Sequence, residues 1–492
     1  MIVASARSRG ILLTLLSVAV VSPASAAPSL ARSLTGCELP GLDRPARCGS
    51  FEVAEDPRKP AGRRIALRFA VLPARGGAPL PEPVVYLAGG PGLGALGSAA
   101  LFGDGFTALQ ERHEVVLVDL RGTGGSGALR CDWESPAQAA GALLAGEFEA
   151  SWLHRCLERL DADPRFYTTP LAADDLDRLL EALGYPRVHL LAASFGTRVA
   201  LEVLRRHPDR VATATLRAAS PGFKLLHRVG DGAAAALQAA FDRCAASVEC
   251  RSAVPDPPGD FAALLARLDE EPVPLAVPGP GGTRVELALD RELFAGIVFR
   301  MLYDRAFADR LPRLVRATLD GDARELGELA VRLAGGIAGL DVGAYLSVVC
   351  SEDVPFASVE PSRGEGWHDF LGTRISSRLE AACRVWPRGT VPADFKRPVS
   401  APTPVLLLSG ALDPTTPPGL GERAAATLPA STHMVDRELS HLPTWTGCFA
   451  DAVARFVALG ALPELSASCS DRVVVIRRGG SGPTAAASED VQ

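Results

Sequence analysis

Residues 188–206 read VHLLAASFGTRVALEVLRR, and this stretch decides the fold. Its first five residues form a short apolar run, which is typical of a strand buried on both faces of a parallel sheet. The apolar residues of 197–206 recur at helical spacing, so a helix is predicted there. Ser194 therefore falls on a sharp turn between a buried strand and a helix, with small residues on both sides of it.

Similar apolar runs recur along the chain and alternate with helical patterns. One helical pattern covers 174–183 and ends at a glycine, directly before the strand of Ser194. Strands that alternate with helices predict an α/β fold with a mainly parallel central sheet. The predicted buried strands are 84–88, 115–118, 188–192, 211–216 and 404–408, with two earlier strand-like stretches within 50–72 and a last strand over 432–436.

The composition changes between residues 222 and 399. Ala, Leu and Arg dominate there at helical spacing, so we expect a mostly helical insertion that caps the sheet. The core of the fold is then expected from 27–221 and again from 400–470. The remaining 471–492 are rich in Gly, Ser, Ala and charged residues, and we expect a disordered tail.

Residues 1–26 are predicted to be a signal peptide. Two arginines precede a short apolar run, and Ala-Ser-Ala at 24–26 supplies a cleavage site. The run is short for a bilayer span, so a membrane anchor is the weaker alternative. We therefore expect a secreted or periplasmic protein that leaves the membrane after cleavage.

Ten cysteines lie after the predicted signal peptide. An even number in an exported chain favours disulfides. The number alone leaves the connectivity open, and order along the chain suggests five local pairs. These are Cys37–Cys48, Cys131–Cys156, Cys244–Cys250, Cys350–Cys383 and Cys448–Cys469.

Charge and ligand spacing disfavour several classes of function. The net charge is −6 without a basic stripe, so a nucleic-acid partner is not expected. No Cys-x-x-Cys occurs and no cysteine has a histidine at ligand spacing, so neither a metal nor another cofactor is expected.

Two further residues complete a candidate catalytic triad with Ser194. Asp413 follows the strand 404–408, and His441 follows the last strand. The carboxyl ends of parallel strands meet at one edge of the sheet, where α/β folds place their sites. We expect His441 to take the proton of Ser194 and Asp413 to orient the imidazole. The structural alternative for Ser194 alone is a helix N-cap.

Two glycine-rich loops follow other strands. Residues 88–92 read AGGPG, and glycines there allow a backbone amide to point into a pocket. The amides of Gly90 and Phe195 are the predicted oxyanion-hole donors, the alternative being a plain Gly-Pro turn. In the second loop, Asp119 and Arg121 are expected to pair with each other and to brace the chain near the nucleophile.

A combination of motifs supports a family resemblance over roughly residues 37–470. Together they resemble the proline-iminopeptidase and tripeptidyl-aminopeptidase group of α/β-hydrolases, in particular secreted bacterial members with a TAP-like C-terminal segment. Ala88, Ala192 and Ser440 depart from the His, Gly and Gly that are usual in this group, which bears on specificity more than on chemistry. The motifs are Gly89-Gly90-Pro91-Gly92, Asp119-x-Arg121-Gly122-x-Gly124-x-Ser126, the Ser194 turn, Cys350-Ser351-Glu352-Asp353, Cys383-x-x-Trp386-Pro387, Gly410-x-x-Asp413-Pro414-x-Thr416-Pro417, and Cys448 with Cys469 around the last helix.

The resemblance implies an α/β-hydrolase fold with a large helical cap, and cleavage of short N-terminal units from a peptide substrate. Such an enzyme needs a carboxylate for the free α-ammonium, and Glu352 resembles the acid expected for that task. The alternative for Glu352 is an exposed surface acid. Two other functions stay open: an esterase or other acyl hydrolase of the same fold, and an inactive α/β-hydrolase used for binding.

Overall fold

The computed structural model of the protein describes most of the chain after residue 29. Most of the predicted signal peptide lies outside the described residues, as do residues 478–492 of the predicted tail. None of the helices in the described part combines the length and apolar character of a membrane span. The described residues are 30–42, 45–98, 109–222, 229–337, 339–357, 366–371, 374–442, 447–462, 464–465 and 467–477, with Met1 and Ala100.

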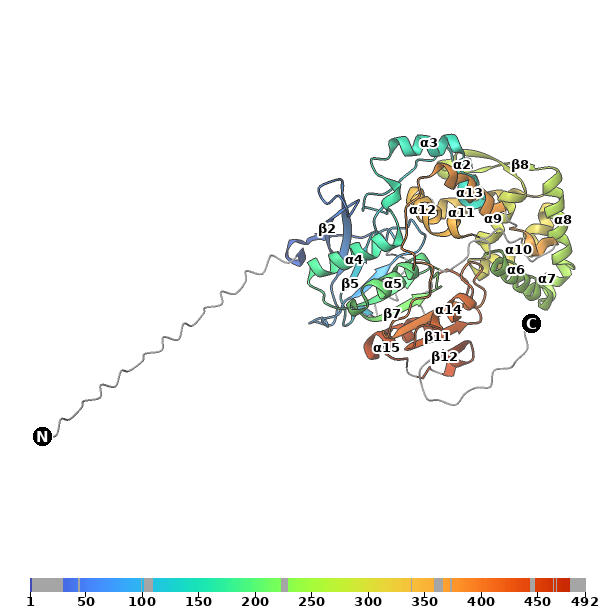
Figure 1. Ribbon diagram of the computed structural model, residues 1–492. Coiled ribbons are helices and arrows are strands. Elements are labelled where there is room, and N and C mark those ends of the chain that lie inside the picture. The colour runs from blue at the N-terminus through green and yellow to red at the C-terminus, as the bar shows by residue number, and fades with distance from the viewer. Residues whose placement is uncertain are drawn as a thin grey trace.

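The predicted parallel sheet is confirmed. In the described part of the chain ten strands form one sheet, in the order β1-β2-β3-β5-β4-β6-β7-β10-β11-β12 (Figure 1). The six adjacent strands from β5 to β11 in this order run parallel to one another. Antiparallel strands flank them on both sides. Their bounds are β1 Thr35–Cys37, β2 Ala46–Ala54, β3 Arg64–Leu72, β4 Val84–Leu87, β5 Val115–Val118, β6 Val188–Ala193, β7 Val211–Arg217, β10 Val405–Gly410, β11 Ser431–Asp436 and β12 Val473–Arg477.

Helices cover both faces of this sheet. Helices α4 (Thr169–Leu183), α5 (Phe195–Arg206) and α14 (Pro418–Ala425) pack on one face, and α15 (Gly447–Leu459) packs on the other. Alternate residues of β4 point to opposite faces and all four are buried, as expected for a strand between two helical layers. The continuous apolar runs in the sequence have this origin.

A large helical cap stands beside the sheet, in the upper right of Figure 1. Its core combines helices from 229–336 with α2, which precedes α4 in the chain, so the cap also recruits residues before 222. It contains a β-hairpin, β8–β9, that the helical pattern did not predict. The elements are α2 Pro136–Ala145, α6 Val229–Ala246, α7 Val248–Ala253, α8 Pro257–Glu270, β8 Val273–Pro278, β9 Arg284–Leu289, α9 Arg291–Met301, α10 Arg305–Leu319 and α11 Arg324–Gly336.

A second apolar cluster joins α3 (Ala150–Arg159), α12 (Val342–Val348) and α13 (Arg374–Val385). A short π-helix, Val349–Asp353, follows α12. Two disulfides, Cys131–Cys156 and Cys350–Cys383, lie inside this cluster. All five predicted disulfides are confirmed, and they use all ten cysteines.

The prediction of a disordered tail from residue 471 is wrong at its start. Val473–Arg477 forms β12, which pairs antiparallel with β11 and extends the sheet. It follows the short helix α16 (Ala467–Ser470), which Cys469 links to the start of α15 through the disulfide to Cys448. Pairing with β11 gives this short segment hydrogen-bond partners that the composition of the tail does not reveal.

Candidate active site

Ser194 occupies the turn between β6 and α5 in a strained backbone conformation. Its φ of +53° and ψ of −122° lie where few residues other than glycine are found. Its amide donates to the carbonyl of Arg217 on β7 at 2.9 Å. The turn leaves no space for larger neighbours, because a Cβ on Gly196 would lie 2.2 Å from the carbonyl oxygen of Leu87. The predicted strand–Ser–helix turn is therefore present, with Ser194 at the N-terminus of α5.

The structure brings the three predicted triad residues together. Asp413 follows β10 and His441 follows β11, and these strands are parallel neighbours. His441 Nδ1 lies 2.8 Å from Asp413 Oδ2, and His441 Nε2 lies 3.1 Å from Ser194 Oγ. The acid, the imidazole and the hydroxyl thus form one hydrogen-bonded chain with the geometry of nucleophile, base and orienting acid.

The environment of Asp413 keeps its carboxylate ionised. The amides of Thr415 and Thr416 donate to Oδ1 at 2.9 and 2.8 Å, and the Thr416 hydroxyl donates to Oδ2 at 2.6 Å. Burial by itself raises the pKa of Asp413, but His441 and the hydrogen bonds from Thr416 outweigh it and hold the pKa well below its usual range. The acid can therefore remain charged beside the histidine throughout the neutral range.

A fully buried arginine holds the loop of His441 from the side of the sheet. Arg217, the last residue of β7, donates to the carbonyls of His441 at 3.0 Å, Leu442 at 2.7 Å and Ser440 at 3.4 Å. Burial lowers the pKa of Arg217 to about 10, against the opposing charge of Asp413. The guanidinium still carries its proton at neutral pH, and it fixes three consecutive carbonyls of this loop.

The cap holds the same loop from the opposite side. The carbonyl of Leu302, just after α9, accepts a hydrogen bond from the Ser440 hydroxyl. The next carbonyl, of Tyr303, accepts from the amide of Leu442 at 3.0 Å. Hydrogen bonds from the cap therefore flank the candidate base on both sides along the chain.

The side chain of Tyr303 also touches the imidazole itself. Its ring meets the His441 ring edge-on, with 4.6 Å between centroids and 65° between planes. The side chain of Thr415 hydrogen-bonds the phenol, and burial raises the pKa of Tyr303. The neutral phenol thus joins the cap to the loops of both Asp413 and His441.

The two predicted oxyanion donors lie close to Ser194: Phe195 follows it in the chain, and Gly90 is on a neighbouring loop. Phe195 is the first residue of α5, where backbone amides have no partner within the helix. The loop of Gly90 packs against the nucleophile, since a Cβ on Gly89 would lie 3.2 Å from the Ser194 Cβ. The lining of a narrow cavity includes Gly89, Pro91 and Phe195. Both amides remain candidate donors.

The predicted role of Glu352 as an amine anchor is wrong for this conformation. Its side chain is 0% exposed, so the alternative of a surface acid is wrong as well. Oε1 accepts from the Thr169 amide at 2.6 Å, and Oε2 accepts from the Thr169 hydroxyl at 2.8 Å and from Arg198 Nη1 at 3.1 Å. Burial raises the pKa of Glu352, while Arg198 opposes this shift. Glu352 is an internal ion-pair partner that a substrate amine cannot reach.

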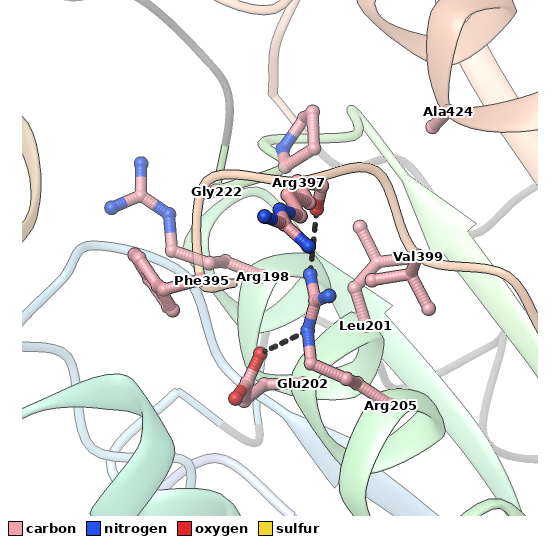
Figure 2. Close-up of a pocket in the computed structure, with 10 residues that line it drawn as sticks. Arg198, Leu201, Glu202, Arg205, Gly222, Phe395, Arg397, Val399 and Ala424 are labelled. Atoms are coloured by element: carbon pink, nitrogen blue, oxygen red, sulfur yellow. Dashed lines mark hydrogen bonds and ion pairs between the residues drawn. The ribbon is translucent and has the colours of Figure 1, made fainter. Parts of the chain in front are cut away.

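Arg198 also borders a hollow on the flank of α5. Figure 2 shows this hollow, in which Arg205 bridges the carboxylate of Glu202 at 3.0 Å and the carbonyl of Arg397 at 2.7 Å. No member of the candidate triad lines it. These contacts hold α5 to the chain segment after the cap, and the candidate triad lies at the other end of the helix.

The expected pairing of Asp119 with Arg121 is wrong. Asp119 accepts from the amides of Leu96 at 2.9 Å and Gly125 at 2.8 Å, which brace the two glycine-rich loops against each other. Arg121 instead forms a two-bond ion pair with Asp175 on α4, at 2.7 and 2.8 Å. Each residue braces its surroundings, but with a partner other than the one predicted.

Sequence reasoning missed several residues that support the triad. Thr416 lies in the quoted Asp413 motif, and a hydroxyl close behind an acid is a readable signal. Arg217 ends an apolar strand, so a buried charge was a further signal. Tyr303 gave no signal, because its contact with His441 arises only from the packing of the cap. No group of three metal-binding side chains occurs among the described residues.

Comparison with known proteins places the chain in a class. Residues 82–251 match the family model described as "alpha/beta hydrolase fold", and residues 368–469 match the model described as "TAP-like protein". The chain therefore belongs to the α/β-hydrolases. Its C-terminal part is similar to TAP-like proteins and another part is similar to a proline iminopeptidase, as the sequence motifs indicated.

Individual relatives are more distant. The chain is 31% identical over 141 residues to a proline iminopeptidase of Arabidopsis thaliana, a match that spans 29% of this chain and 27% of that protein. A solved proline iminopeptidase of Mycobacterium smegmatis is 18% identical, covering 83% of this chain and 98% of its own, with a TM-score of 0.35. A solved esterase of Thermogutta terrifontis is 17% identical, covering 83% and 96%, with a TM-score of 0.37.

Proposed function

We propose that this chain is an exported serine hydrolase that removes short N-terminal units from peptides through an acyl-enzyme. One observation carries the catalytic part of the proposal: the continuous hydrogen-bonded chain from Asp413 through His441 to Ser194, with separations of 2.8 and 3.1 Å. Its members come from three strand ends of one sheet, the edge at which α/β folds place their sites.

In the first half of the proposed reaction, Ser194 Oγ attacks the carbonyl carbon of the scissile bond while His441 Nε2 takes its proton. The carbonyl oxygen becomes an anion, and the amides of Phe195 and Gly90 donate to it. His441 then gives the proton to the leaving nitrogen, the C–N bond breaks, and the N-terminal unit remains bound to Ser194 as an ester.

In the second half, water replaces the leaving amine. His441 takes a proton from the water, the resulting hydroxide attacks the ester carbon, and the proton passes to Ser194 Oγ as the bond to the enzyme breaks. The ionised Asp413 stabilises the imidazolium in both halves. The chemistry uses only these side chains and two backbone amides.

The preference for N-terminal units is supported by the motifs shared with this group of enzymes and by the cap. The cap lies close against the candidate base through Leu302 and Tyr303, which leaves less space than an open cleft that accepts a long chain. Export is supported by the predicted signal peptide and by the five disulfides, which persist in oxidising compartments.

A fluorophosphonate probe tests the catalytic proposal. We expect it to label Ser194 and to leave the Ser194→Ala variant unlabelled, with turnover reduced on the order of 10⁶-fold. Ser252→Ala is a matched control, because Ser252 is an exposed serine on α7 of the cap and should keep full activity. Labelling at another serine, or an active Ser194→Ala variant, would refute the assignment.

The esterase alternative gains support from Glu352, because the carboxylate expected to hold a substrate amine is already occupied by Thr169 and Arg198. A panel of peptide anilides with free and acetylated N-termini, measured beside p-nitrophenyl esters, separates the two functions. An aminopeptidase should prefer the free amine. Equal turnover of both peptides, with faster turnover of esters, would favour the esterase.

A further inference from the structure

Arg300 brings a positive charge close to the candidate base. It is the penultimate residue of α9, and its guanidinium carbon lies 4.2 Å from the centroid of the Tyr303 ring. The same ring meets the ring of His441 at 4.6 Å. The arginine and the imidazole therefore both contact one aromatic ring.

The surroundings of Arg300 differ from those of the buried arginines. Arg121 and Arg198 bond to carboxylates, and Arg217 bonds to three backbone carbonyls. Arg300 forms no ion pair with any acid in the described part of the chain, and its Nε is buried without a hydrogen-bond acceptor. Its polar contact there is the neutral phenol of Tyr303.

Two acids close to Tyr303 are already engaged. Asp413 is bonded to His441, Thr415 and Thr416. The carboxylate of Asp304 caps α10 by accepting from the amides of Ala306 at 2.8 Å and Phe307 at 3.3 Å. A partly buried cation without a counter-ion gains when an anion reaches it, because its lost hydration is then replaced by a charge-assisted bond.

We propose that Arg300 binds a carboxylate of the substrate, so that the site favours substrates with a negative charge next to the bond that is broken. The inference rests on the proposed function only in placing the scissile bond at Ser194. Neighbouring residues of a peptide are about 3.8 Å apart along the backbone. A carboxylate on the residue next to the scissile bond can therefore extend past the Tyr303 ring to Arg300. The carboxylate can belong to a Glu or Asp side chain or to the C-terminus of a short peptide.

Paired substrates test this proposal. The first pair is the p-nitrophenyl monoester of glutaric acid and the neutral p-nitrophenyl butyrate. Two peptide pairs separate the sources of the carboxylate: Glu against Gln beside the cleaved bond, and a free against an amidated C-terminus. We expect the wild type to favour the charged member of the ester pair and of at least one peptide pair by about 10- to 100-fold in kcat/KM.

The variants assign that preference to Arg300. Arg300→Gln should abolish the ratio while changing the rate on neutral substrates much less, and Arg300→Lys should retain part of it. Arg313→Gln is the matched control, because Arg313 is an exposed cap arginine on α10 that pairs with Glu249. A ratio near one in the wild type, or an equal loss on charged and neutral substrates in Arg300→Gln, would overturn the proposal.

The same assays separate this proposal from the proposed function. A preference for charged esters without any peptide hydrolysis would keep the role of Arg300 and refute the aminopeptidase. Peptide hydrolysis without a charge preference would support the aminopeptidase and refute the role of Arg300. If no substrate is hydrolysed, labelling rates with anionic and neutral phosphonates at Ser194 give the ratio, and no labelling by either refutes both.

Discussion

Arg217 offers the sharpest test of how the sheet positions the candidate base. Its guanidinium donates to three consecutive carbonyls, of Ser440, His441 and Leu442. The bonds to Ser440 and His441 are buried, and the bond to Leu442 is partly buried. Arg217→Lys keeps the positive charge. The lysine side chain is shorter and ends in one ammonium nitrogen, so it cannot reach the three carbonyls that the planar guanidinium contacts. We expect the variant to lose two of the three hydrogen bonds.

The magnitude follows from the bonds that are lost. Each buried carbonyl left without a donor costs about 1–3 kcal/mol, so the loss of two bonds should lower the free energy of unfolding by about 2–6 kcal/mol. The loop then no longer fixes His441, and a displacement of about 1 Å at a catalytic group lowers the rate about 100-fold. Because the base acts in the transition state, the loss should appear in kcat with KM little changed.

The assay compares Arg217→Lys with Arg121→Lys. Arg121 is an equally buried arginine, but it bonds Asp175 and carbonyls on the side of β2 and α4. The free energy of unfolding, measured in urea, should fall by a similar amount in both variants. Only Arg217→Lys should have a lower kcat when activity is expressed per folded molecule. Equal loss of kcat in the two variants, or unchanged kcat in Arg217→Lys, would show that Arg217 contributes to stability alone.

Four further outcomes are expected. Asp413→Asn should lower kcat about 10⁴-fold. Because the pKa of Asp413 is held well below its usual range, the wild-type pH–rate profile should show no ionisation of this acid in the range in which ordinary carboxyl groups titrate. Tyr303→Phe removes the hydroxyl but keeps the ring, so kcat should fall about tenfold. Unchanged resistance to an added protease would show that the variant keeps its fold. Burial lowers the pKa of His433 to about 4, so the folded state binds fewer protons than the unfolded state between about pH 4 and 6.5. The free energy of unfolding should therefore fall by up to about 3 kcal/mol as the pH drops through that range. Denaturation measured at a series of pH values should show a weaker pH dependence for His433→Gln. Replacing Cys350 and Cys383 by Ala should cost about 2–4 kcal/mol in urea unfolding, and unchanged stability would contradict a structural role for the bridge.

The strands of the sheet and the place of the candidate triad were predictable because these residues are constrained locally. A strand buried on both faces must be apolar throughout, as in 84–87 and 405–408, and each such strand leads to a loop at the same edge of the sheet. Ser194, Asp413 and His441 each follow such a strand. Because parallel strands have their carboxyl ends at one edge of the sheet, the three residues are predicted to lie close together. The hydrogen-bonded chain among them follows from this alignment.

The remaining errors concern partners that are distant in sequence. Glu352 lies 183 residues from Thr169, and no local pattern shows that they bond. Arg121 contacts Asp175 on a helix rather than Asp119 in its own motif. Likewise α2 packs in the cap because of its apolar face, although its place in the chain is within the core. Pairings of this kind depend on how the elements pack, which periodicity alone does not determine.

The cap is joined to the core at three places around the candidate triad. It is joined to the core through Leu302 and Tyr303 at the base, and through Asp341 at the glycine-rich loops, where Asp341 accepts from the Gly124 amide at 2.6 Å. A third junction is the buried pair of Glu352 with Arg198.

Separating the cap from the core would break these three junctions together. The buried pair alone weighs heavily, because an ion left unpaired in the interior costs about 3–5 kcal/mol. The geometry of His441 depends on the same contacts, so a cap that lifted for each substrate would also displace the base. We therefore expect cap and sheet to unfold as one cooperative unit, and two separate transitions in calorimetry would contradict this view.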